Sequence, residues 1–68
     1  MNSEIIGSWA GIVWQILNEK GPMKIKDIKK EAKLREKDVY AAIGWLAREQ
    51  KVTFAVVDGD KEETVALA

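Results

Sequence analysis

The segment "LREKDVYAAIGWLAREQKV", residues 34–52, has the pattern of an amphipathic helix that follows a turn. Its apolar side chains recur three and four residues apart, a spacing that places them on one face of a helix: Val39, Ala42, Ile43 and Leu46. We expect a helix from Glu36 to about Gln50 that buries this face, with Leu34 in the preceding turn filling the gap between two helices. The outward face is less usual, because it holds mostly Ala, Gly and Trp and only two charges.

The composition is that of one small globular domain spanning residues 1–68. With 47% hydrophobic and 32% charged residues the chain differs from disordered sequences, and no apolar run has the length of a membrane span. The absence of cysteine excludes disulfides and thiolate-metal sites. The first residues lack the basic region and the small-residue cleavage site of an export signal, so we expect a cytoplasmic protein.

Charge is unevenly distributed along the chain although its net value is +0. Residues 24–37 carry seven basic and three acidic side chains, whereas residues 49–63 carry two basic and five acidic ones. A zero total gives no overall attraction to nucleic acid. Any attraction to an anionic partner must therefore come from the positive middle segment.

A first helix is expected in the N-terminal third of the chain. Asn2 or Ser3 can cap its start, and it should end at Lys20 because Gly21 favours a left-handed turn and Pro22 cannot continue a helix. We expect an apolar arc of this helix to face the core: Ile5, Trp9, Ile12, Val13 and Ile16, with Ile6, Ala10 and Leu17 widening it.

Short elements follow the first helix and the third. Met23–Ile25 favours an extended strand, and the apolar spacing of Lys26–Ala32 predicts a short helix. Toward the C-terminus, β-branched content predicts strands at Val52–Val57 and Thr64–Leu67, joined by a turn in the acidic segment "DGDKEE" (residues 58–63). The extended piece can add a third strand at one edge of this hairpin.

The register of the hairpin has two solutions. A tight turn at Gly59 and Asp60 pairs Phe54 with Val65, whereas a longer loop pairs Phe54 with Leu67. Both keep the apolar faces of the two strands together, so the pattern does not choose between them.

The segment "GPMKIKDIKKEAKLREKDVYAAIGWLAREQKV", residues 21–52, resembles the core of a winged helix-turn-helix domain. The apolar residues typical of that core stand at the expected places: Leu34, Val39, Ile43, Leu46 and Val52. With "GSWAGIVWQIL" (residues 7–17) in front, the chain resembles a small prokaryotic winged-helix family of unassigned function. The resemblance implies an α+β fold, a three-helix bundle with a C-terminal β-hairpin wing and a short strand before the second helix. Winged helices bind DNA, RNA or proteins, so the fold alone does not select a partner.

The sequence departs from the DNA-binding pattern in two respects. Arg35 precedes the third helix, where a capping Ser or Thr is usual. The wing segment at residues 58–63 is acidic, whereas a wing that lies along a phosphate backbone is usually basic.

The basic segment supplies candidate phosphate-binding residues: Lys24, Lys26, Lys29, Lys30 and Lys33. Lys37, Tyr40 and Arg48, on the outward face of the third helix, are candidates for contacts near the bases of double-stranded DNA. For the lysines, the alternative is a solvated helix face with i,i+4 ion pairs. For the third helix, the alternative is that Tyr40 and Trp45 cover the hairpin or a neighbouring subunit. The sequence leaves both interpretations open.

A second stripe of the first helix is a candidate surface for homodimerisation. It consists of Gly7, Gly11, Trp14 and Asn18, to which Trp45 of the third helix can be added. Two glycines inside a helix cost roughly 0.5–1 kcal/mol each relative to Ala, and close approach of a partner helix would offset that. The alternative is that the glycines make room for Trp45 or the hairpin within one chain.

Catalysis is not expected. The chain has no His and no Cys, and it lacks a glycine-rich phosphate loop. The acidic wing lacks the spacing of a calcium loop, so no metal, cofactor or small-molecule substrate is indicated. We expect a non-enzymatic, DNA-binding regulator-like domain or, alternatively, a protein-interaction module that forms homodimers and does not bind nucleic acid.

Overall fold

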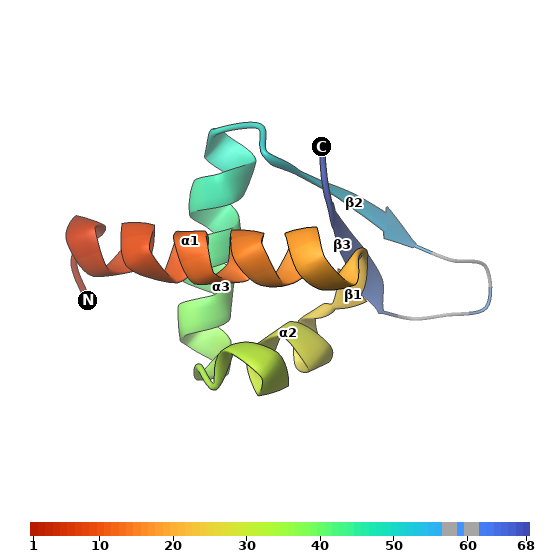
Figure 1. The fold of residues 1–68 in the computed structure, drawn as a ribbon, viewed down its shortest axis with the longest axis horizontal. Coiled ribbons are helices and arrows are strands. Elements are labelled where there is room, and N and C mark those ends of the chain that lie inside the picture. Colours follow the sequence, from red (N-terminus) through yellow and green to blue (C-terminus); the bar gives the residue numbers. More distant parts are fainter. Residues whose placement is uncertain (57–58, 60–61) are drawn as a thin grey trace.

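Three helices and a three-stranded antiparallel sheet make up the computed structural model, which describes residues 1–56, 59 and 62–68 (Figure 1). The elements follow in the order α1 (Ser3–Lys20), β1 (Met23–Lys24), α2 (Ile25–Ala32), α3 (Glu36–Arg48), β2 (Val52–Val56) and β3 (Glu63–Leu67). Helix α1 crosses α3, and the β2–β3 hairpin projects beyond the helices (Figure 1). The predicted α+β winged arrangement is confirmed.

The core lies where α1, α2, α3 and the base of the sheet meet. All four residues expected on the inner face of α3 are buried, together with side chains from every other element except β1: Ala10, Val13, Leu17, Ile28, Val39, Ala42, Ile43, Leu46, Val52 and Val65. Leu34 is half-buried and packs against this cluster, as expected for the residue in the turn before α3. The period of the third helix therefore identified its buried face correctly.

The prediction for the buried face of α1 was wrong in its centre. Ile5 and Ile12 are 40% and 44% exposed, whereas Ala10 and Leu17, expected only at the margin, are buried. Two apolar stripes lie side by side on this helix, and α1 turns the one containing the small Ala10 toward α3. A small side chain lets two crossing helices approach closely, a preference that periodicity alone does not reveal.

The ends of α1 follow the expected capping chemistry. The Asn2 side-chain oxygen accepts a hydrogen bond from the Ile5 backbone N–H at 2.8 Å, which identifies Asn2 as the cap. At the other end Gly21 takes φ +80° and its N–H donates to the Leu17 carbonyl at 2.9 Å. The predicted end at Lys20 is confirmed.

Two other boundaries differ from expectation by one or two residues. Helix α2 begins at Ile25, so β1 is correspondingly short. Helix α3 ends at Arg48 because Gln50 takes a left-handed backbone with φ 59°. The Gln50 N–H donates to the Ala47 carbonyl at 3.0 Å and the Lys51 N–H to the Leu46 carbonyl at 2.9 Å, which closes the last turn as a Schellman motif.

The sheet has the order β1-β3-β2 and selects the first of the two expected registers, in which Phe54 pairs with Val65. The expected edge strand is confirmed, since Met23 also pairs with Val65 on the other side of β3. Phe54 and Val56 are nevertheless 48% and 62% exposed, because the hairpin extends past the helices (Figure 1). The expected extension of β2 to residue 57 and the Asp60 half of the expected turn lie outside the described residues.

Replacing Gln50 by Gly should raise the free energy of unfolding by about 0.5–1 kcal/mol, because Gly adopts positive φ without the steric cost that Gln carries. Urea unfolding of both proteins measures the difference. The matched control is Gln15→Gly in the interior of α1, which should lower stability by a similar amount. A Gln50→Gly variant less stable than the parent would contradict the role assigned to this residue.

Candidate nucleic-acid interface

Helix α2 carries its lysines on the side opposite its buried residue. Ile28 is fully buried, whereas the lysines at positions 26, 29, 30 and 33 are exposed. At 100° per residue the three lysines within α2, at positions 26, 29 and 30, fall within an arc of about 100°, and Lys33 follows the last residue of the helix. The amphipathic pattern that anchors α2 in the core thus also gathers its cations into one stripe.

The turn into α3 extends this stripe. Lys33 takes a left-handed backbone with φ 57°, and the Leu34 N–H donates to the Lys29 carbonyl at 3.3 Å. The chain then enters α3, whose first turn carries the exposed Lys37. We call Lys29, Lys30, Lys33 and Lys37 the lysine corner.

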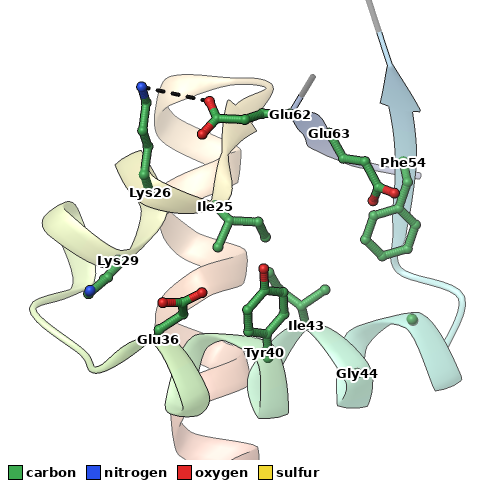
Figure 2. Close-up of a pocket in the computed structure, with 11 residues that line it drawn as sticks. Ile25, Lys26, Lys29, Glu36, Tyr40, Ile43, Gly44, Phe54, Glu62 and Glu63 are labelled. Atoms are coloured by element: carbon green, nitrogen blue, oxygen red, sulfur yellow. Dashed lines mark ion pairs between the residues drawn. The ribbon is translucent and has the colours of Figure 1, made fainter. Parts of the chain in front are cut away.

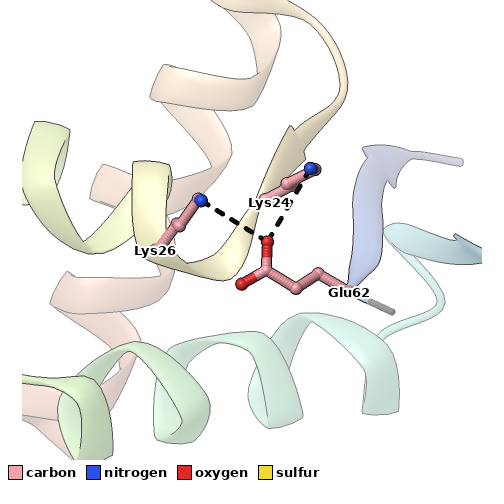
Figure 3. A network of polar contacts seen from close by, with 3 residues as sticks. All are labelled: Lys24, Lys26 and Glu62. Atoms are coloured by element: carbon pink, nitrogen blue, oxygen red, sulfur yellow. Dashed lines mark ion pairs between the residues drawn. The ribbon is translucent and has the colours of Figure 1, made fainter. Parts of the chain in front are cut away.

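Two of the candidate phosphate-binding lysines lie beside a wing carboxylate instead. Lys24 Nζ and Lys26 Nζ are each 3.7 Å from Glu62 Oε2 (Figure 3). The pairing of β1 with β3, in which Lys24 lies opposite Thr64, brings these segments together. No local pattern marks Glu62 as a partner of these lysines; the predicted pairing of residues 23–25 with the hairpin was the signal that could have located it.

The members of the lysine corner make no ion pair with any residue that the structure describes. Two of the nearby carboxylates are engaged elsewhere: Glu31 lies 3.7 Å from Lys20 of α1, and Asp38 lies 3.2 Å from Arg35. The expected alternative of i,i+4 ion pairs along α2 is therefore not realised in the described part of the chain. The corner is an exposed cationic cluster.

The start of α3 replaces the missing cap with a buried carboxylate. Arg35 makes no capping hydrogen bond through its side chain, and its Nε instead donates to Asp38 Oδ2. Asp38 is only 4% exposed, and its other oxygen has no hydrogen-bond partner among the described atoms. A negative charge in the first turn interacts favourably with the helix dipole, which compensates in part for the absent Ser or Thr.

A groove of about 660 Å³ opens between α2, the outward face of α3 and the wing (Figure 2). Tyr40 from α3 and Phe54 from β2 both point into it, above the bare backbone of Gly44 (Figure 2). Its charged lining residues are two lysines and three glutamates: Lys26, Lys29, Glu36, Glu62 and Glu63. The groove beside the expected base-proximal residues is therefore lined by two aromatic rings and by one more acidic than basic side chain.

The structure does not bring Arg48 together with the other candidate residues. It lies in the last turn of α3, eleven residues or about 16 Å along the helix from Lys37. Tyr40, in contrast, is half-exposed at the groove, one turn from Lys37. Of the expected base-proximal residues, Lys37 belongs to the lysine corner and Tyr40 adjoins it, whereas Arg48 does neither.

Four of the five candidate dimer residues, all except Asn18, line a shallow hollow of about 250 Å³ between α1 and α3. A Cβ at Gly7 would lie 3.6 Å from the Trp45 ring, so this tryptophan already covers Gly7 within one chain. A Cβ at Gly11 would meet nothing within 4 Å, Trp14 packs partly against the core, and Asn18 is exposed. Gly7 thus makes room for Trp45 of the same chain, as the intramolecular alternative predicts. The role of Gly11 at a dimer interface stays a prediction.

Other kinds of site find little support. None of the helices in the described residues combines the length and apolar character needed to cross a bilayer. Within the same described ranges, acidic side chains form no group of three arranged to hold a metal ion.

Three helices with a short strand before α2, followed by a projecting hairpin, define a winged helix-turn-helix domain. The chain belongs to the family described as winged helix-turn-helix domain (DUF2582), whose model matches residues 1–67. The name of that family assigns no biochemical activity.

Solved structures share this fold. The solution structure of protein BT2368 from Bacteroides thetaiotaomicron is 33% identical over 98% of this chain and 79% of that one, with a TM-score of 0.87. The apo-Zalpha domain of zebrafish PKZ is 24% identical over 91% of this chain and 94% of that one, with a TM-score of 0.83. The Zalpha domain of Carassius auratus PKZ, in complex with Z-DNA, is 19% identical over 93% and 97%, with a TM-score of 0.80. No curated protein matches the chain.

Replacing Gly11 by Ala should stabilise the monomer by about 0.5–1 kcal/mol, because the new methyl group meets open space in a helix interior. Thermal and urea unfolding measure the change. Gly21→Ala, the same substitution at φ +80°, should be destabilising and serves as the control. Loss of stability in the Gly11 variant would show that another backbone approaches this position.

Proposed function

We propose that this domain binds duplex nucleic acid without catalysis, through the lysine corner. The observation that carries the proposal is the set of four exposed lysines that lack a carboxylate partner in the described residues. When lysines of this kind neutralise phosphates, counterions condensed on the nucleic acid are released. The free energy of this release supplies most of the affinity of non-specific DNA binding. The Z-DNA complex of the fish Zalpha domain supports the proposal at the level of the fold.

The distribution of charge determines which surface meets the ligand. Glu62 and Glu63 at the base of the wing would repel phosphates, so contact should run along α2 and the first turn of α3. Lys37 and Tyr40 are the candidates for contact near the bases, while Arg48 is too distant to join them. Phosphate contacts position a protein but carry no sequence information, so weak sequence preference is expected.

Duplex affinity should fall steeply with salt, with a slope of log K against log salt of about −3 to −4 for four phosphate contacts. That slope corresponds to a loss of about 100-fold between roughly 50 and 200 mM salt. Lys30→Glu should weaken binding to duplexes of different sequence by the same factor, since it removes a phosphate contact. Fluorescence anisotropy with mixed-sequence duplexes measures both effects.

The control variant for this experiment is Lys51→Glu, which makes the same change of charge beyond the opposite end of α3. It should retain clearly more affinity than Lys30→Glu. Absence of binding at low salt, or equal losses in the two variants, would refute the lysine corner as the binding surface.

Glu62 should act as an intramolecular competitor of phosphate for Lys24 and Lys26. Glu62→Gln should therefore raise duplex affinity several-fold and make the salt slope more negative by up to about 2. The control is Glu49→Gln, which changes the net charge equally. Glu49 follows the end of α3 and makes no ion pair with a lysine in the described ranges. If both variants gained the same duplex affinity, net charge alone would explain the effect, and competition by Glu62 would be refuted.

A second candidate function is binding of a protein partner without nucleic acid. It is favoured by the groove, where the exposed rings of Tyr40 and Phe54 lie among three carboxylates. Such a surface suits an apolar segment with a positive charge. The salt titration separates the candidates, because this function predicts no affinity for any duplex.

A further inference from the structure

Helix α1 carries an apolar stripe that the monomer covers only in part. The stripe consists of Ile5, Trp9, Ile12 and Ile16 and is called the isoleucine stripe here. Ile5 and Ile12 are among the large apolar side chains left exposed, and the other two are half-buried. In Figure 1, α1 passes in front of α3, and no other element lies in front of α1.

The spacing of the stripe is that of a helix–helix seam. Its residues are separated by four, three and four positions, the alternation that lines one side of a helix in a coiled coil. The residues next to it on the outer flank, Ser8 and Gln15, are uncharged and exposed. Two identical surfaces of this kind can meet without repulsion between like charges.

We propose that two copies of the chain associate through their isoleucine stripes, with the α1 helices antiparallel. A two-fold axis between residues 10 and 11 sets Ile5 of one copy opposite Ile16 of the other, and Trp9 opposite Ile12. Every apolar residue then faces an apolar residue, and each large indole lies against a branched side chain. This self-matching is the requirement for a closed two-fold interface.

Charge favours the antiparallel arrangement over the parallel one. In the antiparallel pair, Glu19 of one copy lies near Asn2, at the positive N-terminal end of the other α1 helix. In a parallel pair the two Glu19 side chains approach each other, and the helix dipoles repel. The occupant that fits the stripe is therefore a second copy in reversed orientation.

This interface is distinct from the candidate dimer surface predicted at Gly7, Gly11, Trp14 and Asn18. That surface lies on the other flank of α1, where Trp45 of the same chain already covers Gly7. The isoleucine stripe shares no residue with the lysine corner, so separate variants can test dimerisation and duplex binding.

Sedimentation equilibrium of the full chain, from roughly 10 µM to roughly 1 mM, tests the proposal. One helix per copy gives an interface at the small end of the known range, so a weak dimer that forms as concentration rises is expected. Ile12→Lys should weaken association at least tenfold, because it places two charges in the seam. Far-UV circular dichroism and the melting temperature verify that this variant stays folded, as expected for a side chain outside the core.

Two controls assign the surface. Val56→Lys makes a comparable change at an exposed wing residue and should dimerise like the parent. Asn18→Lys adds a charge on the other flank of α1 and should also leave the dimer intact. A mass that stays monomeric over the whole range, or equal losses in Ile12→Lys and either control, would overturn the proposal.

The orientation has its own measurement. The chain has no cysteine, so Ser3→Cys accepts a single spin label at the start of α1. Antiparallel pairing separates the two labelled positions by about 22 Å along the helix axis, whereas parallel pairing places them side by side, about 10 Å apart. Double electron–electron resonance measures the distance between the two spin labels. Labels about 10 Å apart would refute the antiparallel arrangement.

Discussion

Strand β3 connects the C-terminal hairpin to the helices because it pairs on both of its edges. Val65 lies opposite Met23 on one side and Phe54 on the other, and it is fully buried. This double pairing is what holds the start of α2 beside the base of the wing. The position of the groove and the approach of Glu62 to Lys24 and Lys26 both depend on it.

The pairing of β3 with β1 also separates charge on a chain whose net charge is zero. Where the sheet meets α2, wing carboxylate and lysines neutralise one another, and the groove beyond them is mildly acidic. One turn further along, the lysine corner faces solvent and makes no ion pair with the described residues. The two ends of a single short helix therefore present different surfaces to a partner, which is why net charge is a poor guide to binding here.

Much of the fold could be read from the sequence, because α3 has one unambiguous apolar face and because Gly21 and Pro22 leave a single place for α1 to end. The rotation of α1 could not, since two adjacent apolar stripes satisfy the same period and only the packing of Ala10 against α3 distinguishes them. The lysines were recognisable as a cluster. Their division into neutralised and exposed members depends on a contact between residues 24 and 62, which no local pattern encodes.

The left-handed backbone at Lys33 also has a consequence for the kind of ligand that the corner can accommodate. Three of the four corner lysines lie in helices α2 and α3 and the fourth ends α2, so the main chain of the corner is already ordered before a ligand arrives. The side chains, in contrast, are long and flexible, and they can follow anionic surfaces of different curvature. Under the duplex binding proposed above, such a base with adaptable tips would respond to the density of negative charge more than to groove width, so right-handed and left-handed double helices are both expected to bind.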